Sequence, residues 1–231
     1  MTHYQKAIPK HCTEEILDQM ERSFFKIKGK GNEFGFFCFM KNKNKNIPVL
    51  ITKDDININE NNIVNISLNG NNIEIKLGVM RYKNERDKIS IIEIEDNKKY
   101  KTKYLEFDDG LYEKDPEMLY HKELIYIIQY TNKNDILVSY SMIKNINKNE
   151  LIYNSDISSK SKFCLIVNLS NNKLIGIHIN KFNNYNKGIL FKFSIDRFHY
   201  IYKFKSKNDI DLLFQIEQKD INNKVYFLDY K

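Results

Sequence analysis

Two nucleophilic side chains, Ser161 and Cys164, lie in the segment SSKSKFCLIVNLSNNKLIGIH (158–178), which ends at His178. A serine or cysteine acts as a nucleophile only when a base lies within hydrogen-bond reach. Two apolar runs on either side of a short polar turn predict that this segment is a β-hairpin. Cys164 would share one face of its strand with Lys162, because successive side chains alternate. The run FCLIV predicts a buried strand, in which a free cysteine packs and does not react.

The composition is that of a globular chain. The sequence has 231 residues, of which 42% are apolar, and it contains 15 Phe and 15 Tyr. This length allows one larger domain or two small halves packed together. No apolar run approaches the ~20 residues that a membrane-spanning helix needs. Residues 1–17 lack the apolar core of a secretory signal, so we expect no signal peptide.

The cysteines and histidines show no metal-binding pattern. Cys12, Cys38 and Cys164 are far apart in the sequence, and the five histidines are scattered. A zinc site needs four ligands that come close together in space, so we expect no metal ion and no other cofactor. An odd number of cysteines suits free thiols in a reducing compartment. We therefore expect a cytoplasmic location.

The basic charge has two explanations. The net charge is +7 and the pI is about 9.0, which is compatible with an anionic partner. Runs such as KNKNKN (41–46) and NINENN (57–62) indicate instead a coding sequence biased toward A and T. The lysines are dispersed and acidic residues interrupt them, so this second explanation is favoured.

Local patterns predict one helix followed by many short strands. Residues 13–24 begin with a capping-type Thr13 and place apolar residues near one face, which is typical of a short amphipathic helix. Asn69–Gly70 between alternating apolar residues predicts a tight hairpin. The other predicted strands are the runs 33–40, 47–52, 88–95, 123–130, 135–143, 163–179 and 188–195.

The spacing of these strands predicts the fold class. We interpret the charged segment 96–118 as a connection between two halves of the chain. Most gaps are too short for the crossover helices that parallel strands require. We therefore predict an all-β, mainly antiparallel sandwich or pair of barrels. The aromatic and charged tail, 197–231, would add a helix or a hairpin.

One set of segments occurs in a recognisable order and spacing: the helix TEEILDQM and the runs FGFFCFM, IPVLITKDDI, ISIIEI, ILVSYSMIKNIN and NLSNNKLIGIHIN. In this order and spacing the segments resemble the trypsin-like peptidases of protists and large viruses. The resemblance covers about residues 8–196 and implies a chymotrypsin-like double β-barrel with a cleft between the barrels. It places the domain in residues 1–196, with the first barrel at about 25–95, a connection at about 96–122 and the second barrel at about 123–196. Residues 197–231 would form a C-terminal extension.

The same resemblance implies that the catalytic triad is lost. Asp55 stands at the family's histidine, Lys88 at its aspartate (with Asp87 beside it) and Lys162 at its serine. An aspartate cannot replace histidine as the base at neutral pH. Phe163 stands at a glycine of the nucleophile loop, and a tight oxyanion loop depends on that glycine. The chain is predicted to be inactive as a serine protease.

Two interpretations of the altered cleft remain open. Asp55, Lys88 and Lys162 could be a salt-bridged or solvated remnant, which is the favoured interpretation. Alternatively, the lysines could bind phosphate or carboxylate as point charges. His178 stands where the family also has a histidine, so the resemblance explains its presence without a catalytic role.

A second, local resemblance points to nuclease chemistry. Tyr140 and Lys144 in YSMIK are similar to a Tyr-x-x-x-Lys stretch of the poxins, viral nucleases that cleave cyclic GMP–AMP without a metal. The resemblance implies that Lys144 and Tyr140 would hold or activate a ribose hydroxyl while His3 or His11 protonates the leaving oxygen. On an extended strand, positions four apart lie ~13 Å from each other. The pair could meet at one atom only if the chain bends there.

These features favour a catalytically inactive trypsin-like protein that acts through binding or as a structural component. A rigid double barrel freed from catalysis can use its loops as contact surfaces. We expect a protein partner, with an anionic ligand, a nucleotide or a second copy of the chain as further candidates, and no membrane association. A place in a large assembly such as a viral particle is compatible with a small basic pseudoenzyme. The alternative is a poxin-like, metal-independent nuclease.

Overall fold

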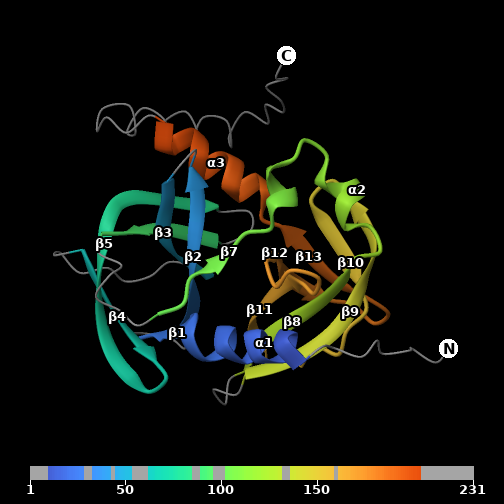
Figure 1. Cartoon of the computed structure of the whole chain (residues 1–231), viewed down its shortest axis with the longest axis horizontal. Coiled ribbons are helices and arrows are strands. Elements are labelled where there is room, and N and C mark those ends of the chain that lie inside the picture. The colour runs from blue at the N-terminus through green and yellow to red at the C-terminus, as the bar shows by residue number, and fades with distance from the viewer. Residues whose placement is uncertain are drawn as a thin grey trace.

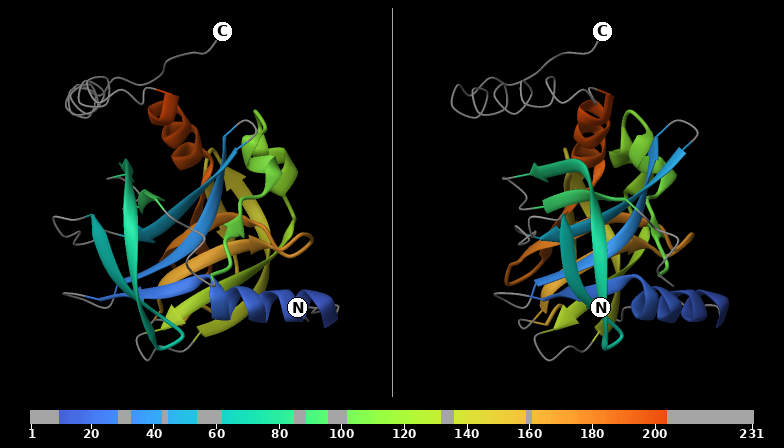
Figure 2. Two further views of the ribbon diagram at one scale, coloured as in Figure 1. Left: turned by 60° about the vertical axis from the view of Figure 1, so that its left-hand side comes forward. Right: turned by 90° about the vertical axis from the view of Figure 1, so that its left-hand side faces the viewer.

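In the computed structural model, two β-barrels lie side by side, the first on the left and the second on the right of Figure 1. The structure describes residues 10–28, 33–42, 45–53, 62–84, 89–95, 102–131, 136–158 and 161–203. Helix α1 (Lys10–Arg22) and helix α3 (Lys192–Lys203) lie at opposite ends of the molecule in the views of Figure 2. No helix in the described ranges is long and apolar enough to span a membrane.

The first barrel contains six antiparallel strands in the order β1-β4-β5-β6-β3-β2, and the pairing of β1 with β2 closes it. A short seventh strand, β7, runs parallel to β2 and leads into the second barrel. The strands of this sheet are β1 (Phe24–Ile27), β2 (Glu33–Asn42), β3 (Lys45–Lys53), β4 (Ile63–Leu68), β5 (Asn71–Asn84), β6 (Ile89–Ile94) and β7 (Leu105–Glu106).

The second barrel is closed in the order β10-β13-β12-β11-β8-β9. Helix η1 (Asp109–Tyr112) and helix α2 (Pro116–Tyr120) belong to the connection that precedes it. Its strands are β8 (Leu124–Thr131), β9 (Ile136–Asn147), β10 (Glu150–Tyr153), β11 (Ser161–Asn168), β12 (Leu174–Lys181) and β13 (Asn186–Leu190).

Strands β2 and β3 are buried on both faces, which explains why their sequences are almost continuously apolar. Phe37 and Leu50 face the interior of the first barrel, where they pack with the other residues of its own core. Phe36 and Ile51 face the opposite way, into a larger core that includes residues of the second barrel. Because neighbouring side chains of a strand alternate, each strand contributes to both cores. The two barrels therefore share one packed interface.

Asp108 anchors the connection to the second barrel. Its buried carboxylate accepts hydrogen bonds from Tyr120 Oη at 2.8 Å and from the backbone N–H of Gly110 at 2.9 Å. The other oxygen accepts from the amides of Asn168, at 3.1 Å, and Asn171, at 2.7 Å. The two bonds from asparagine join residues 60 and 63 positions apart and hold the connection against the end of β11 and the turn that follows it.

Helix α1 is fixed to both halves of the chain. Gln19 donates to the carbonyl of Asn172 at 2.8 Å and accepts from Tyr126 Oη at 2.7 Å, both in the second barrel. Lys103, just before β7, forms ion pairs with Glu15 at 2.5 Å and with Asp18 of the helix at 2.6 Å. Helix α1 is therefore held both by the second barrel and by the segment that precedes β7.

The predicted fold class is confirmed: the protein is mainly antiparallel β, with two six-stranded barrels and a short N-terminal helix. The predicted hairpin joins β4 to β5, and both Asn69 and Gly70 have positive φ, at 49° and 78°. These are the signs of φ that a two-residue hairpin turn requires. Part of the tail, up to Lys203, belongs to helix α3, and residues 204–231 lie outside the described residues.

Candidate functional site between the barrels

The three positions that the family resemblance assigns to a catalytic triad adjoin the ends of three strands. Asp55 and Lys88 lie outside the described residues, but they adjoin β3, which ends at Lys53, and β6, which begins at Ile89. Lys53 and Ile89 are paired residues of neighbouring strands. Lys162 belongs to β11 of the other barrel, and its side chain lies outside the described residues.

The start of β11 contains a β-bulge. Ser161 pairs with Thr131 and Phe163 pairs with Tyr130, so Lys162 is an extra residue between two consecutive pairs. A bulge changes the direction in which the neighbouring side chains point, and bulges are frequent beside active sites. The backbone here is a strand of the barrel, and it leads from the 154–158 segment directly into the core.

The hydroxyl of Ser161 forms a hydrogen bond with a side-chain amide. Its hydroxyl donates to Oε1 of Gln129 at 3.0 Å, and the same oxygen accepts the backbone N–H of Ser158 at 3.0 Å. Gln129 is buried and donates in turn to Ser139 Oγ, at 2.8 Å, and to the carbonyl of Asp156, at 2.9 Å. An amide oxygen is not a base that can remove a hydroxyl proton. The hydroxyl therefore serves to hold the segment before β11.

Cys164 is a buried thiol, as the run FCLIV predicted. Only 3% of the residue is exposed. Burial raises the pKa of the thiol to about 12, although a hydrogen bond with Ser161 and the charge of Lys53 act in the opposite direction. Because the thiolate is the nucleophilic form, Cys164 is unreactive at neutral pH.

His178, on β12, contacts Tyr153 and lies within the electrostatic influence of Lys53. Its Nδ1 is 2.9 Å from Tyr153 Oη. Burial, with the positive charges of Lys53 and Lys181, lowers the pKa of the imidazole to about 4. A triad histidine has a carboxylate at this nitrogen, which stabilises the charged ring; here a phenol occupies the position and cations surround it. His178 is therefore neutral and weakly basic.

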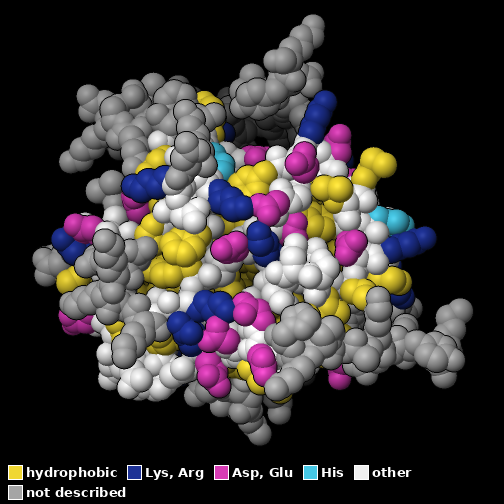
Figure 3. Space-filling model, in the orientation of Figure 1, with side chains coloured by type: hydrophobic (Ala, Val, Ile, Leu, Met, Phe, Trp, Pro, Cys, Tyr) yellow, Lys and Arg dark blue, Asp and Glu magenta, His cyan; other side chains and the backbone are white. Residues whose placement is uncertain are grey.

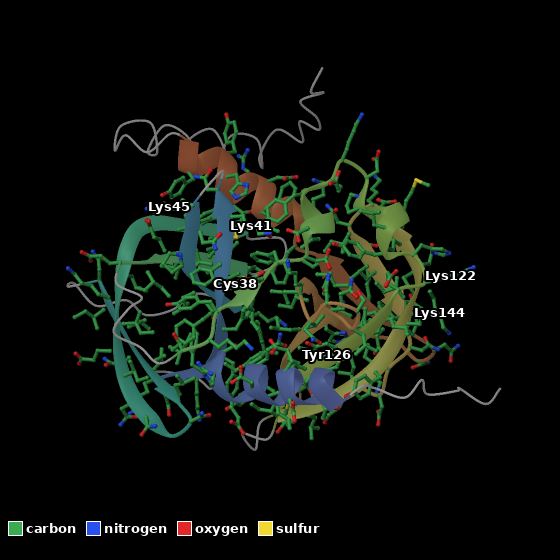
Figure 4. The ribbon with its side chains drawn as sticks, in the orientation of Figure 1. Cys38, Lys41, Lys45, Lys122, Tyr126 and Lys144 are labelled. Atoms are coloured by element: carbon green, nitrogen blue, oxygen red, sulfur yellow. The ribbon has the colours of Figure 1, made fainter. Side chains whose placement is uncertain are left out.

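The residues of the predicted nuclease site lie in different surroundings. Tyr140 packs beside Tyr126, with ring centroids 6.5 Å apart, and burial and the neighbouring Cys12 raise its pKa. Lys144 points to the outside of the second barrel in Figure 4. Its Nζ donates to the amide of Asn154, at 2.7 Å, when that amide is oriented to suit its neighbours. The described contacts of Tyr140 and Lys144 do not bring these two side chains together.

The histidines of that predicted site are only partly described. His3 lies outside the described residues, whereas the backbone of His11 is part of α1 and its side chain is not described. His11 precedes Cys12, the α1 residue whose charge affects Tyr140. The structure thus brings the first turn of α1 beside the middle of β9.

Sequence reasoning missed Gln129 and Lys53. A single glutamine inside the apolar run ELIYIIQY is a signal, because a buried amide requires several hydrogen-bond partners. Lys53 gave no comparable sequence signal, because its charge acts on the pKa values of His178 and Cys164, which belong to the other barrel. Within the described residues, no cluster of three or more His, Cys, Asp or Glu has the geometry of a metal site.

Comparison with solved structures defines the class of this fold. The chain superposes on "Crystal structure of Rv3671c protease, inactive form" with a TM-score of 0.52 and 12% sequence identity, over 80% of this chain and 92% of that one. Together with the two closed six-stranded barrels, this likeness shows a trypsin-like protease fold. No protein-family model matches the sequence, and no curated protein matches it.

Proposed function

We propose that this protein is a pseudoprotease, a trypsin-like fold without peptidase activity, that acts through binding. The observation that carries the proposal is the hydrogen bond from Ser161 to Gln129, which ties the hydroxyl nearest the expected nucleophile position to an amide. His178, with its pKa lowered to about 4, and the buried Cys164 do not replace the missing base and nucleophile. The replacements at Asp55, Lys88 and Lys162 support the same conclusion.

Activity-based labelling tests the loss of peptidase chemistry. The folded protein is treated at pH 7.5 with a fluorophosphonate probe and, separately, with a thiol-directed probe, beside trypsin and papain as positive controls. We expect no labelling of the folded chain by either probe. Labelling that disappears in Ser161→Ala, or in Cys164→Ala, would refute the proposal, because it would demonstrate an activated nucleophile.

A protein partner is supported by apolar side chains exposed on α2 and β9. Met118 is 85% exposed, Leu119 50% and Met142 43%. Figure 3 shows hydrophobic side chains at the surface in the region of these elements. Flexible methionines adapt to apolar partners, and grouped exposed apolar residues mark interaction sites. We therefore assign the α2–β9 surface (Met118, Leu119 and Met142) to an apolar segment of a partner protein.

Proximity cross-linking in a native extract tests this surface. The double variant Met118→Glu/Met142→Glu should lose a partner that the unaltered chain captures, because carboxylates cannot be buried in an apolar contact without a large cost. Leu17→Glu, at a comparably exposed apolar residue of α1, is the matched control and should retain that partner. Equal loss in both variants, or loss in neither, would remove this surface from the proposal.

A metal-independent nuclease is the second candidate. The specific observation in its favour is the position of Cys12 beside Tyr140, which brings the backbone of His11 to the strand that contains Tyr140 and Lys144. The test is incubation with 2′,3′-cyclic GMP–AMP in EDTA, followed by chromatography. Cleavage that is lost in both Tyr140→Phe and Lys144→Ala, but retained in Lys114→Ala, would establish this function and refute the pseudoenzyme. Intact substrate after prolonged incubation would remove the candidate for this dinucleotide.

A further inference from the structure

The turn between β12 and β13 presents two aromatic rings to solvent. The backbone N–H of Phe182 donates to the carbonyl of Tyr185 at 2.8 Å, which closes the turn. The two rings stack on each other with centroids 4.7 Å apart and an angle of 20° between their planes. Phe182 is 42% exposed and Tyr185 is 38% exposed. Stacking holds the two rings in one orientation, and their exposed surface is available to a further flat group.

Positively charged side chains lie beside this aromatic turn. Lys144 Nζ binds the amide oxygen of Asn154 at 2.7 Å, and the same amide donates to the carbonyl of Asn184, within the turn, at 2.9 Å. Lys181 immediately precedes the turn, and its Nζ donates to the carbonyl of Ile157 at 2.8 Å. Lys144 is thus linked to the turn through Asn154, Lys181 adjoins the turn in the chain, and these hydrogen bonds are to neutral groups.

Among the described residues, the acidic side chains near the turn neutralise little of this charge. Asp156 lies 3.9 Å from Lys181 Nζ and is fully exposed, so the interaction is at the outer limit of an ion pair. Glu150 is engaged with Lys187 at 2.6 Å. Among the described residues, the turn thus combines two stacked aromatic rings with two neighbouring lysines, Lys144 and Lys181.

We infer that the aromatic turn (Phe182 to Tyr185), together with Lys144 and Lys181, binds single-stranded nucleic acid. An unpaired base would stack on the outer face of Phe182 or Tyr185, and the adjoining phosphates would contact the two ammonium groups. The inference rests on the proposed binding function and names a ligand class for a second surface, separate from the α2–β9 surface. A duplex would be a poor ligand, because its bases are already stacked and paired. A protein partner would not require cations held beside the rings.

Fluorescence anisotropy with a labelled 12-nucleotide oligouridine, at low salt and in EDTA, tests this inference on the full chain. Phe182→Ala and Tyr185→Ala should each weaken binding about 5- to 150-fold, since one base–aromatic stack contributes about 1–3 kcal/mol and 1.4 kcal/mol is a factor of ten. Tyr185→Phe keeps the ring and should bind like the unaltered chain. Phe193→Ala, at an aromatic residue of α3 that is 51% exposed, is the matched control and should also bind normally.

The lysines are tested by the salt dependence of binding. Lys144→Gln should reduce the slope of log K against log salt concentration by about 0.7, the value for one phosphate contact with a single strand. Lys114→Gln, at an exposed lysine near α2, should leave the slope unchanged. All five turn and lysine variants alter exposed side chains, and thermal melting followed by circular dichroism checks that each one folds.

Three outcomes would overturn the inference: no binding of oligouridine at low salt, equal binding of a 12-base-pair duplex, or unchanged binding in Phe182→Ala and Tyr185→Ala. The proposed function has its own readout, the labelling by peptidase probes. Absent oligouridine binding without probe labelling would remove the nucleic-acid site and leave the pseudoprotease. Labelling by a peptidase probe, together with oligouridine binding that depends on the two rings, would refute the pseudoprotease and retain the nucleic-acid site.

Discussion

Replacing Gln129 with methionine removes four hydrogen bonds at nearly constant side-chain volume. The lost partners are Ser139, Asp156, Ser158 and Ser161, at distances of 2.8 to 3.0 Å. Each intramolecular hydrogen bond contributes a net ~0.5–1.5 kcal/mol to stability, so Gln129→Met should lower the free energy of unfolding by about 2–4 kcal/mol. The serines are half-buried and can recover part of their bonding with water, which places the expected loss below the full sum of four bonds.

Urea unfolding measures this loss of stability. Because the chain has no Trp, unfolding is monitored by far-ultraviolet circular dichroism and tyrosine fluorescence. Ser161→Ala is the matched variant: it removes only one of the four bonds and should cost about 0.5–1.5 kcal/mol. If Gln129→Met costs no more than Ser161→Ala, the amide does not organise the segment before β11. In that case the structural role assigned to the Ser161 hydroxyl would be wrong.

Three further predictions concern buried groups. His178 should titrate by NMR with a pKa near 4, and Lys181→Gln should raise that pKa. Because the imidazole of the unfolded chain binds its proton at higher pH, the free energy of unfolding should fall by up to about 3 kcal/mol as the pH drops from about 6.5 to about 4. His178→Asn should remove this pH dependence. An unchanged pH dependence in His178→Asn would contradict the assignment. Asp108→Ala should destabilise the protein by about 3 kcal/mol or more in urea, because it leaves buried donors without an acceptor; a loss below about 1 kcal/mol would show that these donors find other partners. Cys38 and Cys164 should react with a disulfide reagent only after unfolding, because both thiols are buried and burial raises both pKa values. Rapid reaction of either thiol in the native protein would contradict the packed core.

Local patterns were sufficient to predict most of the barrel strands. The hairpin at Asn69–Gly70 followed from the need for positive φ at both positions, which is a property of the two residues themselves. The apolar runs of β2 and β3 identified strands, but they did not show that each strand divides its side chains between two cores. The sequence also predicted a helix near α1, although that helix begins earlier, at Lys10.

The candidate site was less accessible to prediction. The sequence showed that no histidine follows β3 and no glycine-rich loop precedes β11, because these are local properties of the chain. It could not show that Ser161 would bind Gln129, since those residues lie 32 positions apart and meet only when β8 and β11 pair. The register of β11 contains a bulge, so even the alternation of side chains along that strand was not predictable from residue spacing alone.

By itself, the sequence determined that this chain forms short antiparallel strands, because strand periodicity is a local property. It also determined that no histidine closely follows β3 and that no glycine lies at residues 154–160, before β11. Only the tertiary structure decided which polar groups meet. The contact of Tyr153 with His178, the effect of Lys53 on that imidazole and the link from Lys144 through Asn154 to the aromatic turn all join separate segments of the chain. Such contacts depend on how strands pair and on how the two barrels pack, and a one-residue change of register would replace every one of them.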